Sequence, residues 1–215
     1  MTNLLPDAEV VAAYLEVRGR VVGILRDLDE ADATVTVPSC PGWTVAELAS
    51  HMMGVVDDIL EGRMEGVTTD PWTQAQVERL RGLSLAQLAD HYEASAGRFD
   101  AVLPHVPSPS NSQLVMDAVT HEHDLREAVG RAGAHDSLAV RVALGWLLNM
   151  AEGRQPGLAA RLRDSGVSEF DLLRSLSGRR SAAQMTALGL PADEIVSMLA
   201  GSPLKPPASG AAAGR

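Results

Sequence analysis

Residues 44–61 read TVAELASHMMGVVDDILE, and this stretch decides the fold class of the chain. Thr44 and Glu47 have the spacing of a capping box, in which the two side chains satisfy free backbone N–H groups where a helix begins. Apolar residues then return at helical spacing, at Leu48, Met52, Val55 and Ile59. We therefore predict an amphipathic helix over residues 45–61, with this stripe turned towards a core.

The same helical period recurs along the rest of the chain, and no segment alternates as a strand would. It predicts helices over residues 8–28, 70–81, 85–103, 113–129, 138–150, 169–176, 181–188 and 191–200, with loops over 31–43 and 104–112. We predict an all-α protein built on a four-helix bundle, capped by the C-terminal helices. The predicted division is a bundle domain over 1–155, a helical extension over 156–201 and a disordered tail over 202–215.

The composition excludes several classes of protein. The 215 residues carry a net charge of −10 and contain only one lysine, Lys205, so the basic footprint of a nucleic-acid binder is absent. No apolar run is long enough to span a membrane, and the N-terminus lacks the pattern of a secretion signal. We expect a cytoplasmic protein that acts on a small molecule, in an oligomeric state that the sequence leaves open, a homodimer included.

Metal ligation is the chemistry that the sequence favours. The single cysteine, Cys40, excludes a Cys-rich zinc site, so a metal would need histidine and carboxylate ligands. On the helix predicted over 113–129, Asp117, His121 and Asp124 share one face, whereas His123 is turned roughly 200° away from His121. Asp117 and His121 could bind one ion, and His51, beside the apolar stripe of the helix over 45–61, is the best third ligand.

Spacing alone leaves other interpretations open. The bundle could be a metal-free ligand-binding or interaction module, or His121 and Asp117 could act as a general acid and base without a metal. Asp124 could accept a hydrogen bond from a ligand imidazole or be an exposed acid. Cys40 could have a lowered pKa beside a helix start, but a small packing residue is the simpler interpretation.

Three segments, in order, are similar to one known family. Residues 38–54 (PSCPGWTVAELASHMMG), 117–126 (DAVTHEHDLR) and 172–181 (LLRSLSGRRS) resemble motifs of the mycothiol-dependent maleylpyruvate isomerase family. This family is a branch of the DinB-like four-helix-bundle enzymes. The resemblance implies a divalent metal ion, usually zinc, held by His51, Asp117 and His121, and mycothiol as a thiol co-substrate.

The predicted function is therefore an isomerase or transferase that acts on a small molecule through a metal-bound thiolate. We assign Asp124 and Arg126 to catalysis, and Arg174, Arg179 and Arg180 to binding of the polar groups of the thiol. Two departures from the family pattern lead us to expect a substrate other than maleylpyruvate. Asp117 stands where the isomerase has glutamate, and few residues follow Arg180, where that enzyme has a further domain.

Overall fold

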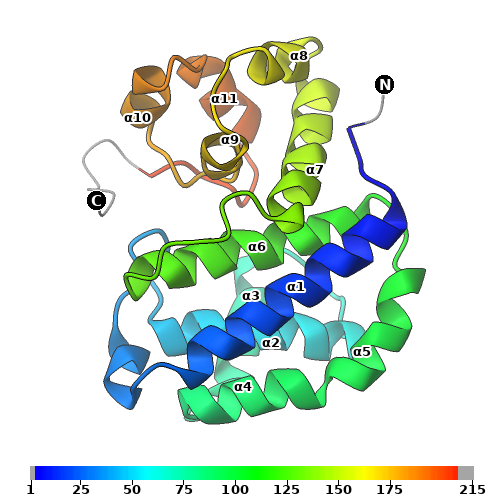
Figure 1. Ribbon diagram of the computed structural model, residues 1–215, viewed down its shortest axis with the longest axis vertical. Helices are drawn as coiled ribbons and strands as arrows, with labels where there is room; N and C mark the ends of the chain where they lie inside the picture. The colour runs from blue at the N-terminus through cyan, green and yellow to red at the C-terminus, as the bar shows by residue number, and fades with distance from the viewer. Residues whose placement is uncertain (1–2, 208–215) are drawn as a thin grey trace. The chain divides into compact units, whose positions relative to one another are not determined.

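The computed structural model describes residues 3–207, and their regular structure is helical (Figure 1). The α-helices of these residues are α1 (Asp7–Arg26), α2 (Val45–Glu61), α3 (Asp70–Leu80), α4 (Leu85–Ala94), α5 (Ala96–Val102), α6 (Ser110–Ala128), α7 (Leu138–Arg154), α8 (Leu158–Arg163), α9 (Glu169–Leu176), α10 (Ala182–Ala187) and α11 (Ala192–Leu199). Two 3₁₀ helices, η1 (Glu30–Thr34) and η2 (Leu103–His105), join them. Extended pairing within the same residues is limited to one bridge, between Thr36 and Thr44. The predicted all-α fold class is confirmed.

Helix α2 has the predicted bounds because its ends carry strong local signals. The Thr44 hydroxyl accepts from the Glu47 N–H at 3.3 Å, and the Glu47 carboxylate accepts from the Thr44 N–H at 2.9 Å. At the other end Gly62 adopts a left-handed conformation with φ of 69°, which glycine tolerates without a steric penalty. The predicted capping box is confirmed.

Several segments differ from the prediction, among them α7, which ends at Arg154 rather than at residue 150, and η1, which overlaps the loop predicted over 31–43. The long helix predicted over 85–103 is divided at Ser95, whose hydroxyl donates to the Tyr92 carbonyl at 2.8 Å and so competes with the helical pattern. Helix α6 begins at Ser110 rather than at residue 113, and part of the loop predicted over 104–112 is helical. Helix α8, with only six residues, was not predicted because it is too short to show a period.

Two compact units divide the chain, and each is described by itself. The bundle unit comprises Tyr14–Pro107 and His121–Gly133. Its bundle helices are α1 from Tyr14 onwards, α2, α4 continued by α5, and the end of α6 from His121. Helix α2 is central, because it contacts η1, α3, α4 and α5. The hydroxyl groups of Tyr14 and Tyr92, 2.9 Å apart, join α1 to α4 inside the core.

The C-terminal unit comprises the described parts of Met1–Ala13, Ser108–Thr120 and Ala134–Arg215. Within it α7 packs against α8 and α9, and α11 contacts α9 and α10. The predicted tail is described only as far as residue 207, where Ser202 is buried and the Leu204 backbone lies against Gly178. Residues 208–215 of that tail lie outside the described residues, and the predicted domain boundaries stay a prediction.

None of the helices within residues 3–207 combines the length and the apolar character that a membrane span requires.

Candidate metal centre

Helices α2 and α6 bring two predicted ligands together in the bundle unit. His51 and His121 are both buried, and their ring centroids lie 5.0 Å apart at an interplanar angle of 86°. The indole of Trp43 lies 5.0 Å from the His51 ring and 5.9 Å from the His121 ring, between centroids. The structure therefore brings His51 and His121 together, and their role as metal ligands stays a prediction.

A short loop before α2 holds Trp43 in this place. The Val37 N–H donates to the Trp43 carbonyl, and the Val45 N–H donates to the Val35 carbonyl, both at 2.9 Å. At the tip the Trp43 N–H donates to the Cys40 carbonyl at 2.8 Å, which closes a tight turn over Pro41 and Gly42. The loop therefore positions Cys40 and Trp43 together.

A hydrogen-bond relay from α3 fixes the tautomer of His51. Asp58 accepts hydrogen bonds from Arg63 and Arg79, so it is the ionised acceptor of the relay. The Gln76 amide nitrogen therefore donates to Asp58, at 2.8 Å, which turns the amide oxygen of Gln76 towards His51 Nδ1, at 2.7 Å. Since that oxygen can only accept, His51 carries its proton on Nδ1.

Asp124 provides the corresponding hydrogen-bond acceptor for His121. Its Oδ2 lies 3.2 Å from His121 Nδ1, and the Asp124 side chain is fully buried. A carboxylate acceptor at this place favours the tautomer that is protonated on Nδ1. The thiol of Cys40 donates to the same oxygen at 3.6 Å. Asp124 is therefore a hydrogen-bond acceptor for an imidazole and is not an exposed acid.

Both imidazoles thus present Nε2 as the unprotonated nitrogen, which is the form that binds a metal ion. A second acceptor on the far nitrogen is the usual support of a metal-binding histidine, because it orients the ring and raises its basicity. Asp117 lies one turn before His121 on α6 and belongs to the C-terminal unit, so its part in the site stays a prediction. Within the bundle unit, Cys40, His121 and Asp124 form a further group that could hold a metal ion.

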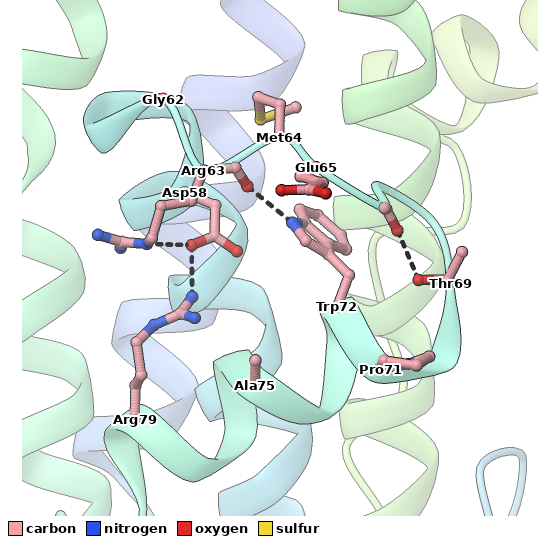
Figure 2. Close-up of a pocket in the computed structure, with 11 residues that line it drawn as sticks. Asp58, Gly62, Arg63, Met64, Glu65, Thr69, Pro71, Trp72, Ala75 and Arg79 are labelled. Atoms are coloured by element: carbon pink, nitrogen blue, oxygen red, sulfur yellow. Dashed lines mark hydrogen bonds and ion pairs between the residues drawn. The ribbon is translucent and has the colours of Figure 1, made fainter.

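The outer end of the relay lines an open hollow of about 480 Å³ between the end of α2 and α3. Figure 2 shows Asp58 at its wall between Arg63 and Arg79, and the Trp72 indole donating to the Arg63 carbonyl. Neither His51 nor His121 lines this hollow. The hollow is therefore separate from the candidate metal centre, although Gln76 connects the two through Asp58.

The relay leads to a testable expectation for Gln76→Ala. Without the amide, His51 loses its Nδ1 acceptor and can rotate or change tautomer, so metal affinity should fall by about 10–100-fold. Titration of the metal-free protein with zinc checks this. Gln74→Ala, on the exposed face of the same helix, is the matched control and should leave the affinity unchanged. An unchanged affinity in Gln76→Ala would contradict the role of the relay.

The other predicted site residues lie in different surroundings. Arg126 donates to the buried carboxylate of Glu122 at 2.9 Å. Arg174 is buried in α9, Arg179 donates to the Ser177 carbonyl at 2.8 Å, and Arg180 donates to Asp171 at 3.2 Å. The three C-terminal arginines belong to the C-terminal unit. The catalytic role of Arg126 and the thiol-binding role of the other three stay predictions.

Sequence reasoning missed Gln76 and Asp58. Both are fully buried, and neither has a motif around it. One signal was present: Gly54 stands inside helix α2, where glycine is costly and usually has a packing reason. A Cβ at Gly54 would lie 2.4 Å from Gln76 Cβ, so this glycine allows α3 to approach closely enough for Gln76 to reach His51.

Fold and site together define a class of protein, an all-α helical bundle with a candidate metal centre between its helices. The chain belongs to the family described as mycothiol maleylpyruvate isomerase N-terminal domain, whose family model matches residues 14–139, more than half of the chain. This family is helical and DinB-like, so the predicted family and bundle type are confirmed. The chain matches no curated protein and no solved structure.

Proposed function

We propose that the protein is a metal-dependent enzyme that uses mycothiol as co-substrate in the isomerisation of a small molecule or the transfer of a group to it. The observation that carries the proposal is the pair of buried imidazoles, side by side and each with a hydrogen-bond acceptor on Nδ1. Membership of the family supports mycothiol as the thiol.

His51, His121 and Asp117 would hold the metal in this proposal. Two neutral imidazoles and one carboxylate suit zinc, and they leave one coordination position open. They also leave a net charge of +1 on a divalent ion, which favours an anionic ligand in the open position. The bound ion would supply the acidity that keeps a small thiol in its nucleophilic thiolate form.

The residues of the chain have supporting roles in this scheme. Gln76 and Asp124 keep the two imidazoles in the ligand tautomer, so no proton has to move from Nε2 before an ion binds. The Trp43 indole packs against both rings and limits how far they can turn. Arg126 would bind the carboxylate of a substrate, which would replace Glu122 as the acceptor of its hydrogen bond.

Metal content tests the proposal. Protein purified without chelator should contain close to one equivalent of zinc or a similar divalent metal, and His121→Ala should lose it. His105→Ala, an exposed histidine of the same unit, is the matched control and should keep the metal. Metal-free wild-type protein that gains nothing on incubation with zinc would instead support the metal-free binding module.

A second measurement addresses the thiol. Mycothiol should raise the melting temperature of the zinc-loaded protein, because a ligand that binds only the folded state stabilises it. The same thiol should have no effect on His51→Ala. A zinc-loaded protein whose melting temperature does not respond to mycothiol would exclude mycothiol as the co-substrate while leaving the metal centre in place.

A further inference from the structure

Cys40 takes part in a second donor group that shares His121 with the proposed centre. Asp124 Oδ2 lies 3.2 Å from His121 Nδ1 and 3.6 Å from Cys40 Sγ. The ligand atoms of the three side chains all lie within 4.8 Å of one another. All three residues belong to the bundle unit, and Cys40 is not held in a disulfide.

These separations match the edges of a tetrahedral metal site. With zinc bonds of about 2.0 Å to nitrogen and oxygen and about 2.3 Å to sulfur, tetrahedral angles require O···N near ~3.3 Å and O···S near ~3.5 Å. The two measured separations lie within about 0.1 Å of these values. Two edges of a tetrahedron are therefore already present, and the ligand atoms of the three side chains lie close enough together to bind one ion.

The charges of these side chains also suit a divalent cation. A thiolate and a carboxylate together cancel the charge of a divalent cation, which a buried site needs because an uncompensated charge is costly there. Asp124 is fully buried and His121 nearly so. On binding, the thiol proton of Cys40 leaves to solvent, and the imidazole proton of His121 moves from Nδ1 to Nε2.

We propose that Cys40, His121 and Asp124 form a thiolate-containing site for zinc and for softer divalent cations such as cadmium. This goes beyond the proposed function, which uses His121 through Nε2. Because the imidazole has only one unprotonated nitrogen when neutral, the two donor groups exclude each other. An ion held with Cys40 has its charge cancelled within the protein, so it does not attract an exogenous thiolate.

Cobalt(II) and cadmium(II) test the inference through the metal–sulfur bond. Either ion, added alone to the metal-free protein, should produce a thiolate-to-metal charge-transfer band in the ultraviolet. Cys40→Ser should abolish the band, whereas His51→Ala should keep or strengthen it, because the competing donor group is removed. Ser39→Ala, the neighbouring loop residue, is the control and should keep the band. Absence of the band from both wild type and His51→Ala would overturn the inference.

Alkylation of the single cysteine gives a second readout that needs no new absorption band. Cadmium should slow the reaction of Cys40 with iodoacetamide by at least about tenfold in the wild type and in His51→Ala. Protection seen only when His51 is present would show that the cation binds the other donor group, and would overturn the inference. Failure of the proposed function leaves a different pattern: the band and the protection would then be the same in His51→Ala as in the wild type, because no competing donor group is removed.

Discussion

Gly54→Ala is expected to lower the free energy of unfolding by about 1–3 kcal/mol and to weaken metal binding by about 10–100-fold. Added to the existing backbone, the new Cβ would lie 2.4 Å from Gln76 Cβ, 2.8 Å from Gln76 Cγ and 3.1 Å from Gln76 Cα. Carbon atoms prefer separations of about 3.5–4.0 Å, so α3 has to move away from α2. Urea unfolding and zinc titration measure the two effects.

Two opposing terms set the size of this effect. Alanine gains up to about 1 kcal/mol over glycine in a helix interior, whereas overpacking of a core costs about 1–3 kcal/mol and occasionally more. The contact with Gln76 makes the net change in stability unfavourable. The nearest atoms of Gln76 are on or next to the backbone of α3, so they cannot turn aside as the end of a flexible side chain could. The displaced amide of Gln76 then no longer reaches His51, which is why the metal affinity falls with the stability.

Gly23→Ala is the matched control for this prediction. Gly23 also lies inside a helix of the bundle unit, but an added Cβ there meets nothing within 4 Å. The same substitution should therefore raise the free energy of unfolding, by up to about 1 kcal/mol. If Gly54→Ala proves as stabilising as Gly23→Ala, the close packing of α3 on α2 is contradicted.

The sequence predicts helices well where local signals and period agree. Helix α2 has both a capping box and an apolar stripe, and its predicted bounds are those of the structure. The division at Ser95 was missed because the helical period continues across it: the Phe99 N–H still donates to the Ser95 carbonyl, four residues earlier. The periodicity therefore predicts helical structure on both sides of Ser95. It cannot detect that the Ser95 hydroxyl competes for a backbone carbonyl and divides the helix.

The site was predictable as far as helix geometry and resemblance reach. The shared face of His121 and Asp124 follows from their spacing, and the structure places Nδ1 of one within 3.2 Å of Oδ2 of the other. The acceptor of His51 was not predictable, because Gln76 reaches it from another helix. Cys40 was interpreted as a packing residue for the same reason, since its contact with Asp124 joins positions far apart in the chain.

Glu122→Ala is expected to lower the free energy of unfolding by about 3 kcal/mol. The Glu122 carboxylate is fully buried between two guanidinium groups: Arg20 donates to its two oxygens at 2.7 Å each, and Arg126 donates to one of them at 2.9 Å. These bonds connect α1 to α6. The variant leaves two cations close together with no anion between them, and chemical unfolding measures the loss.

The value lies at the lower end of the range for a broken buried ion pair because the cations keep some contact with water. The side chains of Arg20 and Arg126 are 24% and 14% exposed. Burial lowers the pKa of Arg20, but the hydrogen bond and the charge of Glu122 outweigh it, so the pKa stands above its ordinary value. The guanidinium therefore stays charged in the folded wild type and cannot escape the penalty by losing its proton.

Glu122→Gln and Glu61→Ala separate the sources of this loss. Glutamine keeps the shape and one acceptor oxygen, so Glu122→Gln should cost less than Glu122→Ala while still removing the counter-charge of Arg126 and leaving Arg20 with only Glu16, 3.6 Å away. Glu61 forms an exposed ion pair with Arg98, and its removal should cost less than about 1 kcal/mol. Because Glu122 belongs to neither candidate ligand group and its carboxylate is bound by Arg20 and Arg126, a Glu122→Gln variant should keep the zinc affinity of the wild type. A loss of stability in Glu122→Ala no larger than that in Glu61→Ala would contradict a buried charge cluster between α1 and α6.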